Sequence, residues 1–254
     1  MRFAAAGKIG DYHSIANEAG IPMGSSSGKV PAIIDYCRGM GLIKLIVSTP
    51  SSIKKPVLTH FGRAVFLEDP YLKTNISQWI AHLNLCSSLS GADVWYHVFA
   101  RGTPSLGVSF ERAQLDSYLD LIYDSSTRSK IGPLIGMYED QAAFSKCGVI
   151  SNNDGVLKRK AAPIREDLAL AYGAWILQLM EDHIPEYDQV TTQELEESTG
   201  WRSIAGWDRH EQQRVLGLME SKGLFSIDRH MQPWLLQATS SVESAWHHIY
   251  DLLI

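Results

Sequence analysis

Eleven basic and hydroxyl residues give the sequence its clearest candidate chemistry, which is contact with phosphate oxygens. Hydroxyl groups, backbone N–H groups at a helix start, and lysine and arginine side chains are all donors that suit such oxygens. These residues form short clusters, and two of the clusters stand where an apolar helical pattern begins. The candidates are Ser25, Ser26, Ser27, Lys29, Lys54, Lys55, Arg128, Lys130, Lys158, Arg159 and Lys160.

The segment Gly24–Val30 has some likeness to the phosphate-binding loop of nucleotide hydrolases, but it does not fit that motif. Its glycine spacing is one residue short, and Val30 stands where a serine or threonine would bind magnesium. The preceding residues also lack the pattern of a strand. We therefore expect no bound nucleotide.

Motifs for a catalytic centre are also missing from the sequence. It contains no GxSxG, HExxH or GxGxxG. His247 and Asp251 are four residues apart and could share a metal, although a solvated helix face is the commoner reason for such a spacing. The run from Asp208 to Glu211 could hold a general base, and a helix cap explains it equally well. No catalytic residue and no metal ligand is assigned.

Residues 11–66 carry the pattern helix, tight turn, helix, strand, turn, strand. Gly20–Gly24 breaks the first helix, and a serine hydroxyl can cap the second. The expected inward stripe of the second helix consists of Val30, Ile33, Ile34 and Cys37. Strands are expected at Ile43–Val47 and Pro56–Thr59. This is the order of a winged helix-turn-helix, in which the second helix enters a DNA groove and the hairpin touches the flanking backbone.

Charge supports a nucleic-acid partner for this segment. Residues 1–66 contain eight basic and three acidic residues, a net charge of +5, whereas the whole chain carries −5. A basic module in an acidic chain is a local electrostatic footprint for phosphates. Winged helices also serve as protein-docking modules, and that alternative stays open.

The middle segment, residues 67–161, is expected to be mainly helical. Its aromatic residues have helical spacing, which favours core packing over stacking on bases. We expect a loop at Arg101–Ser105 and a helix capped by Ser109. Residues 125–130 lead into another apolar helical stripe, with basic residues at the helix start. This repeats the design of residues 25–29 and predicts a second helix-turn-helix, with a solvated interdomain helix as the alternative.

The last segment, residues 162–254, contains six basic and fifteen acidic residues, a net charge of −9. It has a third winged-helix-like order, ending in hairpin strands at Ser226–His230 and Trp234–Gln237 and a helix at Val242–Leu253. Since negative charge repels phosphates, protein docking is the preferred role for this segment.

Composition points to the cytoplasm. No apolar run approaches the roughly 20 residues of a membrane helix, and the first residues lack the apolar core of a signal peptide. Only Cys37, Cys86 and Cys147 occur, an odd number at wide spacing, and we expect them to stay reduced.

Four stretches between residues 20 and 125 together resemble a known family. They are Leu58–Phe66, Asp69–Leu72, Trp79–Leu83 and Trp95–Phe99. The family is the SspB component of the bacterial Ssp DNA phosphorothioation systems, which replace a non-bridging phosphate oxygen with sulfur. Its members are domains of unknown function encoded beside genes that resemble phosphoadenosine-phosphosulfate reductase.

This resemblance implies a DNA-nicking protein of a phage-defence system, working on double-stranded DNA. The nick would need a divalent cation, Mg²⁺ or Mn²⁺, with acidic or histidine residues to activate water. Partners would be the sulfur-transfer and ATPase proteins of the same system, reached through the acidic C-terminal segment. No family motif assigns the cleavage residues here.

The sequence therefore predicts a mainly α protein with small β-hairpins, built from tandem winged helix-turn-helix units around a helical middle region. The expected units are residues 1–66, 67–161 and 162–254. A non-catalytic tandem winged-helix adaptor or regulator that recruits protein partners is the alternative to a nickase. A scaffold without a DNA role is the third hypothesis.

Overall fold

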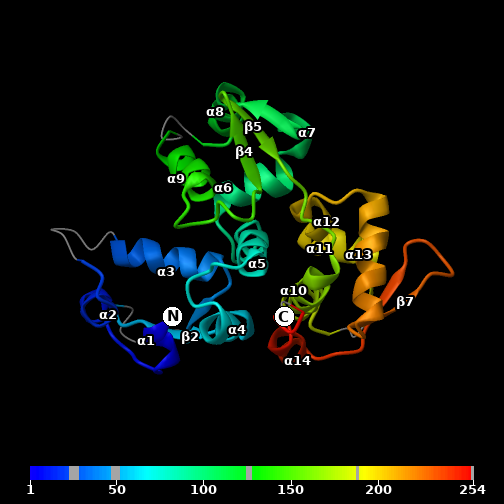
Figure 1. Ribbon diagram of the computed structural model, residues 1–254, viewed down its shortest axis with the longest axis horizontal. Coiled ribbons are helices and arrows are strands. Elements are labelled where there is room, and N and C mark those ends of the chain that lie inside the picture. Colours follow the sequence, from blue (N-terminus) through cyan, green and yellow to red (C-terminus); the bar gives the residue numbers. More distant parts are fainter. Residues whose placement is uncertain (23–28, 47–51, 124–127, 187–188, 253–254) are drawn as a thin grey trace.

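The computed structural model describes the chain apart from residues 23–28, 47–51, 124–127, 187–188 and 253–254. Helices dominate the described residues, and strands form one two-stranded and two three-stranded antiparallel sheets (Figure 1). The predicted mixture of helices and small hairpins is therefore confirmed.

The first segment contains the two helices and two strands expected from its pattern, and it has one further helix on each side of them. In chain order they are α1 (Arg2–Ala5), α2 (Tyr12–Ala19), α3 (Lys29–Gly39), β1 (Ile43–Ile46), β2 (Lys55–Leu58) and α4 (His60–Glu68). Asp11 caps α2, because its carboxylate accepts a hydrogen bond from the N–H of Ser14 at 2.8 Å. Gly20 ends α2 in the left-handed conformation that glycine tolerates best.

The apolar stripe of α3 is narrower than predicted. Val30 and Ile34 are buried, but Cys37 is only half-buried and the Ile33 side chain is 43% exposed. Ile33 instead lines a groove that also contains Ile21 and the exposed ring of Tyr71. A short helix packed along one edge buries fewer positions than the full heptad spacing suggests.

The middle segment contains more strand than expected. Its elements are α5 (Asn75–Leu85), α6 (Asp93–Trp95), the π-helix η1 (Tyr96–Arg101), α7 (Thr103–Leu106), β3 (Ser109–Glu111), α8 (Arg112–Asp120), α9 (Arg128–Glu139), β4 (Ile150–Asn153) and β5 (Val156–Arg159).

Two local predictions in this segment are wrong. The expected loop at Arg101–Ser105 is the end of η1 and the start of α7, where a proline suits the first turn. Ser109 does not cap a helix, since it lies in β3 opposite Lys158. Glu111 caps α8 instead, and the side chain of Gln114 accepts the N–H of Glu111 to complete a capping box.

The last segment follows its predicted order closely. Its elements are α10 (Glu166–His183), β6 (Gln189–Thr191), α11 (Thr192–Thr199), α12 (Trp201–Ala205), α13 (Arg209–Ser221), β7 (Phe225–Asp228), β8 (Leu235–Ala238) and α14 (Val242–His247). The final helix ends six residues earlier than the expected Leu253, at His247. Thr191 caps α11, with Glu194 closing a capping box.

One topology occurs three times in the described chain. In each three-stranded sheet, a short strand directly before a helix pairs with the last strand of the following hairpin, giving the orders β3-β5-β4 and β6-β8-β7. In the first segment, the bridge between Gly10 and Lys54 extends the β1–β2 hairpin in the same sense, directly before α2. A shared topology gives each segment the same helix-and-hairpin frame.

Two buried helices, α5 and α10, hold the three frames together. Nearly every side chain of α5 is buried, as is most of α10, so both are surrounded by other elements. The buried apolar side chains of all three segments form one connected core. The Ser77 hydroxyl on α5 lies 2.7 Å from the Tyr250 hydroxyl, and the rings of Phe61 and Trp246 lie 5.0 Å apart. The last segment therefore packs directly against both the middle segment and the first.

Candidate nucleic-acid interface

The first predicted cluster centres on the start of α3. Lys29 is the first residue of α3 and its side chain is exposed. Ser25, Ser26 and Ser27 lie outside the described residues. Lys29 is thus positioned at the helix end whose backbone N–H groups and dipole favour an anion.

The second cluster lies at the start of β2. Lys54 and Lys55 are both half-buried. The Lys54 ammonium lies 5.4 Å from the centre of the Tyr12 ring, and its backbone N–H donates to the Gly10 carbonyl at 2.8 Å. Lys55 lies opposite Ile46 in the hairpin register. Neither lysine is sealed in the core.

All three acidic residues of the first segment are engaged within the fold. Asp11 caps α2, and the hydrogen bonds from Ser14 hold the pKa of this carboxyl below its ordinary value. Glu18 pairs with Lys8, and Asp35 pairs with Arg38. The remaining basic side chains keep the segment's surplus of positive charge.

Two basic residues near this cluster were not among the sequence candidates. Lys44 on β1 and Arg63 on α4 are both exposed. Burial raises the pKa of Asp182 on α10, and the positive charge of Lys44 opposes that rise, so Lys44 faces α10. Arg63 lines a cavity of about 490 Å³ between α4 and α14. The alternation of buried and exposed residues along β1 could have identified Lys44 as an exposed residue from the sequence. The position of Arg63 beside α14 depends on how the helices pack, which the sequence does not show.

The third cluster divides into exposed and engaged residues. Lys158 and Lys160 are exposed on either side of Arg159. The Arg159 guanidinium donates to the carbonyls of Val98 (2.8 Å) and Gly107 (2.7 Å), which fixes β5 against η1 and α7. Arg159 thus has a structural role that the sequence did not indicate.

Arg128 and Lys130 begin α9, but their side chains lie outside the described part of the chain. In Figure 1, α3 and α9 both lie toward the left of the molecule, whereas α11, α12 and α13 lie toward the right.

The aromatic cluster of the middle segment is a core, as predicted. The indole N–H of Trp95 donates to the Tyr138 hydroxyl at 2.9 Å, and that hydroxyl lies 2.6 Å from Nδ1 of His82. Burial lowers the pKa of His82 to about 3, with a smaller contribution from the charge of Arg159. His82 is therefore neutral and closed to solvent, which suits packing better than proton transfer to a substrate.

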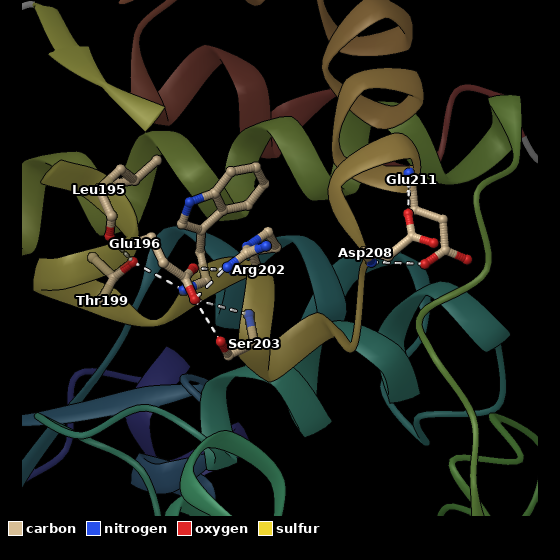
Figure 2. Close-up of polar contacts among 8 residues, drawn as sticks. Leu195, Glu196, Thr199, Arg202, Ser203, Asp208 and Glu211 are labelled. Atoms are coloured by element: carbon tan, nitrogen blue, oxygen red, sulfur yellow. Dashed lines mark hydrogen bonds and ion pairs between the residues drawn. The ribbon is translucent and has the colours of Figure 1, made fainter. Parts of the chain in front are cut away.

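The two polar runs that the sequence offered for chemistry, one near His247 and one near Asp208, make local structural contacts instead. Nδ1 of His248 lies 2.7 Å from the Asp251 carboxylate, and the His247 ring packs edge-on against the His248 ring with the ring centres 5.1 Å apart. Asp251 therefore pairs with His248 and not with His247, the residue considered with it as a metal ligand. Asp208 and Glu211 form a capping box at the start of α13, so the capping interpretation holds (Figure 2).

The described residues provide no group of three or more histidine, cysteine, aspartate or glutamate side chains placed to hold a metal ion. They therefore define no geometry for the divalent cation that the resemblance implies. The three cysteines, all within the described part of the chain, are free thiols, as expected. Among the described helices, none combines the length and apolar character needed to cross a membrane.

Comparison with known proteins identifies structural relatives. No protein-family profile and no curated protein sequence matches the chain. Two solved structures share its fold: a magnesium-bound SspB crystal structure, with a TM-score of 0.62, and an SspB crystal structure, with a TM-score of 0.64. Each is 17% identical in sequence, and each match covers 90% of this chain and 77% of the SspB chain. The protein therefore has an SspB-like fold.

Proposed function

We propose that this protein is a DNA-binding component of a bacterial DNA phosphorothioation system. The observation that carries the proposal is the SspB-like fold over nine-tenths of the chain, which agrees with the resemblance read from residues 20–125. The positive surplus of residues 1–66 supports double-stranded DNA as the ligand. We also propose that the three repeated frames are winged helix-turn-helix units, with α3, α9 and α13 as the groove-facing helices.

The proposed activity is a single-strand nick that lets partner proteins install sulfur. Purified protein incubated with supercoiled plasmid and Mg²⁺ or Mn²⁺ is expected to produce open circles. Plasmid that stays supercoiled at every protein excess would remove this activity. A gel shift of the same plasmid without strand breaks would leave the binding proposal standing.

A second candidate function is a non-catalytic adaptor that binds DNA and recruits the sulfur-transfer and ATPase proteins. One observation favours it: the carboxylates of the first segment, Asp11, Glu18 and Asp35, already serve as a cap and as ion-pair partners. The last segment, with its net charge of −9, is the proposed contact region for those proteins. Copurification with a partner, together with an intact plasmid, is the result that distinguishes an adaptor.

The predicted DNA contacts of the first segment can be tested by removing lysines from each cluster in turn. Lys29→Ala and the double variant Lys54→Ala/Lys55→Ala are expected to weaken duplex binding, because each lost phosphate contact lowers the salt slope of log K by about one unit. Lys73→Ala is a matched control, since Lys73 is exposed but lies outside the four groups of candidate residues. Fluorescence anisotropy across a salt series measures both quantities. Unchanged affinity in both variants would take the first segment out of the interface.

A further inference from the structure

The negative charge of the last segment is not spread evenly over it. Between Thr199 and Trp234, five basic residues face four acidic ones, whereas the remainder of residues 162–254 has one basic and eleven acidic residues. The first of these stretches contains α12, α13 and β7, and the acidic remainder contains α10 and α11. The whole-segment charge therefore does not describe the surface of α13.

A polar groove of about 540 Å³ runs between α11, α13 and the loop that joins β7 to β8. These three elements occupy the places of first helix, groove-facing helix and hairpin in the repeated frame. Figure 1 shows the β7 hairpin extending outward beside α13. The side chains that line the groove and carry hydrogen-bonding amides or guanidinium groups are Gln193, Arg202, Arg209, Gln212, Gln213 and Gln232.

The two carboxylates of the groove are already satisfied. Glu196 accepts hydrogen bonds from the backbone N–H groups of Arg202 (2.8 Å) and Ser203 (3.3 Å), and Figure 2 shows its carboxylate turned toward both residues. Glu197 accepts a hydrogen bond from the Gln193 amide at 2.8 Å. The Arg202 guanidinium, whose Nε lies 4.0 Å from a Glu196 carboxylate oxygen, also offsets part of the negative charge of the groove.

Contacts between α13 and the hairpin hold the groove in shape. The Arg209 guanidinium donates to the Gln232 amide oxygen at 3.1 Å. The Arg229 guanidinium lies 5.2 Å from the centre of the Trp234 ring and also pairs with Glu220 of α13 at 2.7 Å. A helix and a hairpin tied together in this way present their side chains as one preorganised surface.

The chemistry of this groove suits base edges better than phosphates. Its two arginines are balanced by two glutamates, so it has little net charge with which to bind the backbone. Glutamine presents a donor and an acceptor together and pairs with adenine N6 and N7, while arginine pairs with guanine O6 and N7. Gln212 and Gln213 lie on the groove side of α13.

We infer that this groove reads base edges in the major groove of double-stranded DNA and gives the protein a sequence preference. The inference rests on the proposed DNA-binding function and adds a second, specificity-determining contact to the basic surface of the first segment. The basic clusters supply affinity without sequence information, and the groove supplies the selection. The acidic residues of the last segment that lie outside this groove remain available to protein partners.

The test uses the whole chain and a pool of randomised duplexes. Wild-type protein is used to enrich bound duplexes, and anisotropy then compares its affinity for an enriched duplex with that for a shuffled one. Gln212→Ala/Gln213→Ala is expected to lower this discrimination by about tenfold or more. The salt slope should stay unchanged, because no charge is removed. Arg214→Ala is the matched control, since Arg214 is exposed on the same helix but does not line the groove.

Gln232→Ala changes the same groove from its hairpin side. It therefore provides a second test if the Gln212→Ala/Gln213→Ala variant does not fold. Thermal melting verifies that each variant is folded. If wild-type protein binds no duplex, the proposed function fails and the inference fails with it. If it binds DNA but shows no preference, or if both glutamine variants keep the wild-type discrimination, only the inference is overturned. Loss of a protein partner with unchanged discrimination would likewise overturn it and assign the groove to protein docking.

Discussion

His82 lies in the buried aromatic cluster, where it couples folding to pH. Its Nδ1 accepts the hydroxyl proton of Tyr138, because that hydroxyl itself accepts the N–H of Trp95. The imidazole is 1% exposed, and burial lowers its pKa from 6.5 to about 3. In the folded protein, His82 therefore stays neutral at any pH above roughly this value.

The direction of the pH effect on stability follows from the different pKa of His82 in the folded and unfolded chain. Below pH 6.5 the unfolded chain takes up a proton on His82 that the folded protein refuses, so the free energy of unfolding falls as the pH falls from 6.5 toward 3. With these two pKa values, the loss between pH 7 and pH 5 is about 2 kcal/mol. Full burial means that solvent screening does not reduce this figure much.

Urea denaturation followed by tryptophan fluorescence at pH 7 and pH 5 measures the effect. His82→Asn removes the titrating group and keeps an acceptor for Tyr138, so its unfolding free energy should change by about 2 kcal/mol less than that of the wild type over this range. The absolute stability of the variant does not matter for this comparison. His210→Asn, which replaces an exposed histidine, is the control. Equal pH dependence in wild type and His82→Asn would refute the reasoning.

Two further predictions concern packing. A Cβ on Gly62 would lie 1.7 Å from the Leu42 carbonyl oxygen, so Gly62→Ala should destabilise the protein by about 3 kcal/mol or prevent folding. A Cβ on Gly217 in α13 would meet nothing within 4 Å, so Gly217→Ala should stabilise the protein by about 0.5–1 kcal/mol. Urea denaturation at pH 7 measures the free energy of unfolding of both glycine variants. Similar changes in the two variants would contradict the geometry. Arg159→Ala should lower the melting temperature because three acceptors lose their donor, whereas Lys158→Ala should leave it unchanged and weaken only DNA binding.

Several helices were predictable because their signals are local. Apolar spacing, a capping side chain and a terminating glycine lie within a few residues of each other, as at Asp11 and Gly20 around α2 or Thr191 before α11. The prediction that Ser109 caps a helix was wrong, because its place in β3 depends on pairing with Lys158, far along the chain. A strand of three residues has too little pattern of its own to be recognised.

Some properties of the candidate surface could be read from the sequence, and others depended on the fold. The sequence alone determined that residues 1–66 carry excess positive charge, since charge is additive and needs no fold. Only the tertiary structure decided which charges remain available. It commits Arg159 to backbone carbonyls and Glu196 to backbone N–H groups, and it brings α11, α13 and the β7–β8 loop together around one polar groove. Hydrogen bonds between distant segments form only when the core brings them together, so no count of residues could have assigned them.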